Sequence, residues 1–282
     1  MTKENKTPGI PAMLAIFLLP ACFLLPSGAD NYLLFTSGLL FALLPEGAVL
    51  LIIGAVFSKR PVPRVISLPL AVFSGVFFIV CGVFSLRRFL PLTERFSSYY
   101  IGSGLLLTLL LFSAVYIASL SDGAIGRLCS AVLFLTLGLY SLTVLMALKN
   151  GTATALHLSS PSPYSDIEKG LISGLLILEP DVYFLMICLN SKGAHPSPLR
   201  FLLAKGGIIL LFTLPVIYVL GEHIHYSALA SYDLAAYSKS VIIERFNGLF
   251  MGLMTIAAVT RAAVELHAVK LTVNSLQLTG NR

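Results

Sequence analysis

The stretch from Leu128 to Leu148, LCSAVLFLTLGLYSLTVLMAL, contains 21 consecutive residues and no charged side chain. An α-helix rises about 1.5 Å per residue, so a run of this length can cross the hydrocarbon core of a bilayer, which is roughly 30 Å thick. The stretch therefore predicts a transmembrane helix.

The same apolar character extends over the whole chain. Of the 282 residues, 57% are hydrophobic and 11% are charged, and the mean hydropathy is +0.90, whereas about a quarter of the residues in a soluble domain are charged. No stretch is polar enough to form a separate globular domain. We therefore expect a single all-α transmembrane domain over residues 1-282, embedded in a lipid bilayer.

Eight apolar runs, bounded by charged residues or by Pro and Gly clusters, each predict one transmembrane helix. The first run follows Lys3 and Lys6 but has no convincing signal-peptide cleavage site, so we expect a retained helix. The second run is about 26 residues long and must tilt or break to fit the bilayer. The predicted helices of this polytopic bundle cover residues 10-27, 32-57, 65-86, 100-120, 128-148, 169-190, 201-221 and 246-269.

The basic residues of the loops predict the orientation, because cytoplasmic loops retain more Lys and Arg than external loops. With the N-terminus inside, ten basic loop residues are cytoplasmic and seven are external. This bias favours a topology with both termini in the cytoplasm, although Arg87 and Arg88 oppose it. The positive charges lie between apolar runs and form no single stripe, so the sequence does not predict a nucleic acid as a partner.

Ionisable groups inside the apolar runs are candidates for function, because a charge in the middle of a span is costly unless it faces a partner or a wet cavity. The strongest candidate is Glu179-Pro180-Asp181 in the sixth predicted helix. The proline removes one backbone hydrogen bond, and the two carboxylates point in different directions. These features predict an interrupted helix that lines a polar cavity. In the first helix, Pro20-Ala21 marks a second and weaker interruption.

Three further places combine charge with an apolar run. The second predicted helix contains Pro45-Glu46-Gly47, which fits either a transport or binding role or a plain proline kink with Glu46 paired to a basic neighbour. In the eighth helix, Arg261 and Glu265 are one turn apart, which predicts an ion pair on one face or a role in proton coupling. Lys205 lies near the start of the seventh helix, and we expect it to reach the cytoplasmic interface.

Motifs of catalysis are missing from the sequence. It contains no HExxH, no GxSxG and no Walker loop. The four cysteines have no CxxC or Cys/His spacing of the kind that holds a metal. We therefore expect no enzyme, no cofactor and no metal site.

The second half of the chain carries a pattern of segments found in one family of membrane proteins. The segments are Gly170-Leu171-Ile172-Ser173-Gly174 with the residues up to Leu189, then Tyr232-Asp233-Leu234, and then Glu244-Arg245 followed by Leu249-Phe250. This pattern resembles the spore germinant-receptor B-subunit family, in which an ER-x-x-x-LF motif typically opens the eighth helix. The resemblance extends over nearly the whole chain.

The family resembles amino acid-polyamine-organocation transporters, so the resemblance implies a transporter-like bundle in which helices 1 and 6 are interrupted. Their broken ends, around Pro20, Ala21, Glu179, Pro180 and Asp181, would bind a small nutrient, usually an amino acid. Three features depart from the family. Its members have ten helices against the eight predicted here, and their glycine-bearing break in helix 1 is replaced by Leu19-Pro20-Ala21-Cys22. The acidic pair of helix 6 replaces residues that are usually small and neutral. Charge pairing at low dielectric favours an amine-bearing ligand for this pair.

The resulting hypothesis is a subunit of a spore germinant receptor, in the inner membrane of a bacterial cell or spore. It would bind a small nutrient and signal germination together with other germinant-receptor subunits. One alternative is a proton-coupled secondary transporter of amino acids or amines, with Glu179, Asp181 or Glu46 as the proton-binding carboxylate. The other is a structural or assembly protein with a degenerate site, which the two missing helices favour.

Overall fold

The fold is that of a computed structural model, which describes residues 16, 18, 31–59, 69, 72–73, 75–83, 86–87, 103–150, 163–177, 198–221, 224, 230–238 and 246–280. Over these ranges the chain is almost entirely helical and forms no strand, which confirms the all-α class. The helices are α2 (Tyr32–Phe41), α3 (Leu43–Lys59), α5 (Ser103–Ser119), α6 (Asp122–Asn150), α7 (Pro163–Ile177), α9 (Pro198–Leu220), α10 (Ala230–Tyr237) and α11 (Phe246–Gly280).

Four helical stretches in the described part of the chain are long and apolar enough to cross a membrane, and a shorter apolar helix, Gly104–Ser119, accompanies them. These stretches agree with an integral membrane protein of several spans. The number of eight spans stays a prediction, because much of the predicted helices 10-27, 65-86 and 169-190 lies outside the described residues. The four stretches are Tyr32–Ile52, Asp122–Lys149, Leu199–Leu220 and Gly248–Lys270.

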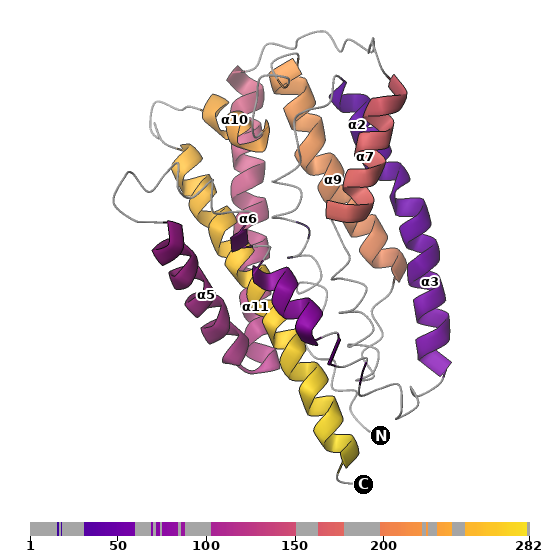
Figure 1. The fold of residues 1–282 in the computed structure, drawn as a ribbon. Coiled ribbons are helices and arrows are strands. Elements are labelled where there is room, and N and C mark those ends of the chain that lie inside the picture. The colour runs from indigo at the N-terminus through magenta and orange to yellow at the C-terminus, as the bar shows by residue number, and fades with distance from the viewer. Residues whose placement is uncertain are drawn as a thin grey trace, which may run out of the picture.

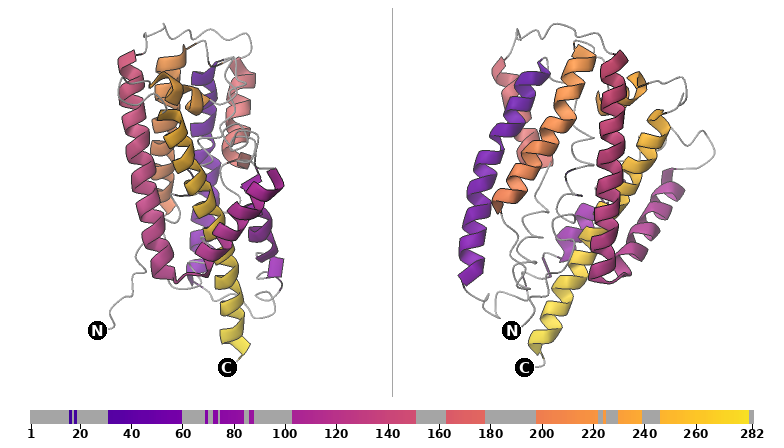
Figure 2. Two further views of the ribbon diagram at one scale, coloured as in Figure 1. Left: turned by 90° about the vertical axis from the view of Figure 1, so that its left-hand side faces the viewer. Right: turned by 180° about the vertical axis from the view of Figure 1, so that it is seen from behind.

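The helices form an elongated bundle with two sides (Figure 1). On one side α2 packs against α7 and α9, and α3 packs against α9. On the other side α11 packs against α5 and α6. Contacts of α6 and α10 with α9 join the two sides. Figure 2 shows that α11 crosses the bundle obliquely and that its last turns extend past the neighbouring helices.

Pro45 explains why the first long helical stretch is divided into α2 and α3. Proline has no N–H to donate to the carbonyl four residues earlier, which belongs to Phe41, and its ring crowds that carbonyl. α2 ends at Phe41, but Ala42 keeps helical backbone angles, φ −59 and ψ −26. The Ala42 N–H donates to the Gly38 carbonyl at 3.1 Å, and the Glu46 N–H donates to the Ala42 carbonyl at 3.3 Å. The two helices are therefore one interrupted span, as the length of this apolar run predicts.

Three glycines bring α2 and α7 unusually close together. A Cβ atom on Gly38 would collide with the Ile167 carbonyl oxygen, and one on Gly170 would collide with the Phe35 carbonyl oxygen. Gly174 faces the end of α2 in the same way. Small residues four positions apart, as in Gly170 and Gly174, let helix backbones approach closely within a membrane.

A buried polar contact fixes the starts of the same two helices. The Asn31 side-chain oxygen caps α2 by accepting two N–H groups of its first turn, at 3.0 and 3.2 Å. The Asn31 N–H donates to Asp166 Oδ2 at 2.9 Å. Asp166 is buried in the first turn of α7, where the helix dipole favours a negative charge. Since Asn31 meets Asp166 and Phe35 meets Gly170, α2 and α7 run parallel.

An aromatic stack joins the two sides of the bundle. Tyr140 of α6 stacks on Phe212 of α9, with ring centroids 4.1 Å apart and an interplanar angle of 9°. The Tyr140 hydroxyl donates to the Phe212 carbonyl at 3.2 Å, which satisfies a polar group that is otherwise fully buried. Phe250 of α11 packs against the same tyrosine ring, with a centroid distance of 5.7 Å. One buried ring therefore contacts helices from both sides.

Several helices begin before or end after the apolar runs that predict them. α6 begins at Asp122, ahead of the predicted start at residue 128, because the Ser121 carbonyl accepts two N–H groups of its first turn. α7 and α9 begin at Pro163 and Pro198, and proline is favoured in the first helical turn. α11 continues to Gly280, and α10 lies where the sequence predicts only a loop. An apolar run thus marks the part of a helix inside lipid but not its ends.

We expect Gly170→Ala to destabilise the protein, because the new Cβ atom would force α2 and α7 apart. Overpacking of a close contact costs about 1–3 kcal/mol, so the melting temperature in lipid nanodiscs should fall by several degrees. Gly207→Ala is the matched control, because nothing lies within 4 Å of a Cβ at that position. Equal melting temperatures for the two variants would contradict the close approach of α2 and α7.

Candidate functional site

Glu46 of α3 and Lys205 of α9 form an ion pair inside the bundle. The Lys205 ammonium lies 2.6 Å from each of the two carboxylate oxygens of Glu46. Both side chains are 0% exposed. Glu46 lies near the middle of the helical stretch from Tyr32 to Lys59, so the pair is far from both ends of this span.

Two glycines beside the charged residues give room to leucine side chains of the opposite helix. A Cβ atom on Gly47 would lie 3.1 Å from Leu202 Cδ1, and one on Gly206 would lie 3.3 Å from Leu43 Cδ1. Each leucine precedes the charged residue of its own helix by three positions, so the two contacts flank the ion pair on either side. The reversed order of the contacts shows that α3 and α9 run antiparallel.

The ion pair couples the position of α3 to that of α9. Transfer of a charge from water to a dry interior costs several kcal/mol, and attraction between two charges offsets this cost only when their geometry is close. Here both carboxylate oxygens lie within hydrogen-bond distance of the ammonium, which is a strong, charge-assisted arrangement. Separation of the two helices without new partners would leave two uncompensated charges in the interior.

α11 contains a second buried ion pair. Arg261 Nε donates to Glu265 Oε1 at 3.1 Å, one turn further along the helix. The Glu265 carboxylate is fully buried, and the Arg261 side chain is 10% exposed. A Cβ atom on Gly82 would lie 3.2 Å from Glu265 Oε2, so this glycine leaves room for the carboxylate.

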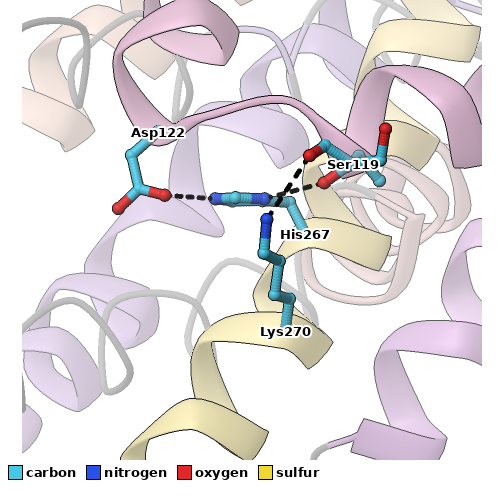
Figure 3. Close-up of polar contacts among 5 residues, drawn as sticks. Ser119, Asp122, His267 and Lys270 are labelled. Carbon is cyan, nitrogen blue, oxygen red and sulfur yellow. Dashed lines mark hydrogen bonds and ion pairs between the residues drawn. The ribbon is translucent and has the colours of Figure 1, made fainter.

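A third polar cluster ties α11 to the turn between α5 and α6 (Figure 3). His267 Nδ1 lies 3.0 Å from the Ala118 carbonyl oxygen, and His267 Nε2 lies 3.1 Å from Asp122 Oδ1. Lys270, one turn further along α11, donates to the Ser119 carbonyl at 3.4 Å. His267 is only 3% exposed, whereas Asp122 is 50% exposed. The cluster therefore links a buried ring to a carboxylate at the surface.

The predicted site residues fall into two groups. Glu46, Arg261 and Glu265 lie in described helices, and each belongs to an ion pair. The structure does not bring these pairs together, because α3 packs against α9 and α11 packs against α5 and α6. Their roles in binding or proton coupling stay predictions. The remaining predicted site residues, Pro20, Ala21, Glu179, Pro180 and Asp181, lie outside the described residues.

The partner of Glu46 is the residue that the sequence does not identify. The expectation that Lys205 reaches the cytoplasmic interface is wrong, because its ammonium is bound to Glu46 in the interior. Charge balance is the signal that could have found the pair, since an acid in one apolar run and a base in another compensate each other inside a membrane. No such signal exists for His267 and Asp122, whose contact depends on the crossing of α11 and α6.

Comparison with known proteins adds no family assignment. The chain matches no family model, no curated protein and no solved structure. Within the described part of the chain, no group of three His, Cys, Asp or Glu residues could hold a metal ion. The resemblance to the germinant-receptor family therefore stays a prediction.

We expect single substitutions in the Glu46–Lys205 pair to be more damaging than the double substitution. Glu46→Gln or Lys205→Met leaves one charge uncompensated, which typically costs about 3–5 kcal/mol. The double variant removes both charges and should recover most of the lost stability. Melting temperatures of the four proteins in the same lipid give the coupling energy as a double-mutant cycle.

Arg200→Gln is the matched control for this cycle. Arg200 lies in the same helix as Lys205 but is exposed, so the loss of its charge should change the melting temperature little. Strictly additive effects of the two single substitutions would contradict a direct interaction between Glu46 and Lys205.

Proposed function

We propose that the protein is a receptor-type membrane subunit that binds a small amine-bearing nutrient, such as an amino acid, and signals to partner subunits of a spore germinant receptor. The observation that carries this proposal is the buried ion pair of Glu46 and Lys205. Ionisable residues inside membrane spans are rare, and they commonly belong to ligand or ion pathways. The sequence resemblance to the germinant-receptor family supports the class of ligand.

The predicted ligand-binding residues Glu179, Pro180 and Asp181 follow α7 in the sequence and lie outside the described residues. α7 runs parallel to α2, and Gly174 of α7 lies beside Ala42. Glu46 comes one turn after Ala42, and the described part of α7 ends at Ile177, about one turn after Gly174. The segment from Glu179 to Asp181 follows directly in the sequence. The two acidic residues of this segment would favour an ammonium group on the ligand.

The ion pair provides a candidate for the element that responds to the ligand. A zwitterionic nutrient offers an ammonium that Glu46 can bind and a carboxylate that Lys205 can bind. Such a ligand would offset the cost of separating Glu46 from Lys205. It would shift the equilibrium between the paired and the separated arrangement only by its difference in affinity for the two. Coupling between sites is typically worth about 1–3 kcal/mol. The change in the position of α3 relative to α9 would then reach the partner subunits.

A proton-coupled secondary transporter of amino acids or amines is the second candidate. The distance of 2.6 Å between Lys205 Nζ and the Glu46 carboxylate favours it, because an acid and a base in direct contact can share a proton. A pH gradient across proteoliposomes should then drive uptake of the ligand, whereas a receptor should bind without uptake. A structural or assembly protein with a degenerate site should show neither binding nor uptake.

We expect an amino acid or a small amine to raise the melting temperature of the protein in lipid nanodiscs. A ligand at one hundred times its dissociation constant stabilises the native state by about 2.7 kcal/mol, which corresponds to several degrees for a chain of this size. Glu179→Gln and Asp181→Asn should each reduce the shift, because each removes a negative charge from the predicted site. The chain has no tryptophan, so a thiol-reactive dye that detects exposure of the buried Cys129 is a suitable probe.

Glu168→Gln is the matched control for the ligand panel, because Glu168 is an exposed carboxylate on α7. This variant should respond to ligands as the wild type does. The proposed site is wrong if no ligand shifts the melting temperature of the wild type. It is also wrong if both site variants respond as strongly as the control.

A further inference from the structure

The contact between α11 and the α5–α6 turn contains a histidine with an acceptor at each ring nitrogen. The Ala118 carbonyl oxygen faces Nδ1, and the Asp122 carboxylate faces Nε2 (Figure 3). A carbonyl oxygen and an ionised carboxylate can each accept a hydrogen bond, but neither can donate one. A neutral imidazole carries one N–H, so it can satisfy only one of these two acceptors. A protonated imidazolium donates to both and adds a positive charge beside Asp122.

The surroundings of His267 are consistent with a contact that depends on its charge. Beside it, α5 and α11 meet through uncharged side chains, which are Ala114, Val259, Ala262 and Ala263 with the partly buried Leu107, Leu110, Leu111, Ile117 and Leu266. Asp122 lies in the first turn of α6 and is half exposed, so its carboxylate is accessible from outside the bundle. The titratable or charged groups on the elements packed here are Tyr116 on α5, then Asp122, Arg127, Cys129, Tyr140 and Lys149 on α6, then Arg261, Glu265 and Lys270 on α11, and Arg87, next to Leu86 of the same apolar cluster.

Most of these groups have other partners or point elsewhere. Arg261 and Glu265 bind each other, and Lys270 donates to the Ser119 carbonyl. Tyr116 is largely exposed. Among the contacts of His267 in the described part of the chain, Asp122 is thus the charged group at hydrogen-bond distance.

We propose that His267 and Asp122 form a proton-binding latch that holds α11 on the α5–α6 turn. The latch is complete when His267 is protonated, and it weakens as the pH rises and one of the two ring nitrogens loses its proton. Histidine side chains in general change charge between about pH 5 and 8, whereas carboxyl groups in general are already ionised over this range. The contact is therefore strongest at the acidic end and is lost toward the alkaline end.

The position of the latch gives it a mechanical consequence. It lies where the apolar stretch Gly248–Lys270 ends, and α11 continues as a helix to Gly280 beyond it. The last turns of α11 extend past the neighbouring helices (Figure 1). The contact of His267 with Asp122 fixes the direction of α11 beyond Lys270. Loss of this contact therefore changes what the end of α11 can reach. This inference does not rest on the proposed nutrient-binding function.

Hydrogen–deuterium exchange of the full chain in nanodiscs tests the latch. Amides of the α5–α6 turn, residues 118–125, should exchange about tenfold faster at about pH 8 than at about pH 5, after correction for the intrinsic chemical rate. In His267→Gln and in Asp122→Asn the corrected rates should not depend on pH over this range. His267→Lys, which keeps a positive charge, should show slow exchange at both pH values.

Lys270→Gln is the matched control, because it removes a neighbouring charge but leaves His267 and Asp122 in place. It should retain the pH dependence of the wild type. If His267→Gln does not fold, Asp122→Asn carries the test, because Asp122 is half exposed and its substitution by the isosteric amide creates no cavity. The latch is refuted if the wild type and Asp122→Asn show the same pH dependence, or if the wild type shows none.

Discussion

The ion pair between Glu46 and Lys205 is the constraint on which the arrangement of one side of the bundle depends. Two charges that are fully removed from water need each other at close range, so α3 and α9 have to meet in one register. Gly47 and Gly206 leave room for the ends of Leu202 and Leu43 at this approach, and Pro45 accounts for the interruption of the span. The position of α2 depends on that of α3, because the two helices are consecutive in the chain. The position of α7 depends in turn on that of α2, because Gly38 and Gly170 hold these two helices close together.

The three polar contacts of the interior constrain the fold to different degrees. Arg261 and Glu265 belong to one helix, so their pair fixes side-chain conformations but not the position of α11. The Glu46–Lys205 and His267–Asp122 contacts each join two elements that are far apart in the sequence. A change in charge at either contact therefore alters the free energy of a helix–helix interface. Signalling and transport both require interfaces of this kind, because ligands and protons act on equilibria between packed arrangements.

The sequence predicts the class of the fold and the kind of site better than the pairing of residues. Apolar runs identify the long helices, and the motif Pro45-Glu46-Gly47 indicates an interrupted span, with Glu46 either paired to a basic neighbour or in a transport or binding role. Lys205 is not recognisable as that partner, since the contact joins residues of separate spans. Helix ends are misplaced for a related reason. Prolines and caps, such as Pro163 and Ser121, decide where a helix starts, whereas hydropathy reports only which part of it suits lipid.

The register of α3 against α9 depends most directly on Glu46 being ionised and shielded from water. Infrared difference spectra between the wild type and Glu46→Gln in lipid bilayers isolate the signal of this one side chain. The substitution should remove an ionised carboxylate band, and the same band should be lost or shifted in Lys205→Met. Removal of a protonated carboxylic-acid band by Glu46→Gln, or a carboxylate band that Lys205→Met leaves unchanged, would contradict the ion pair.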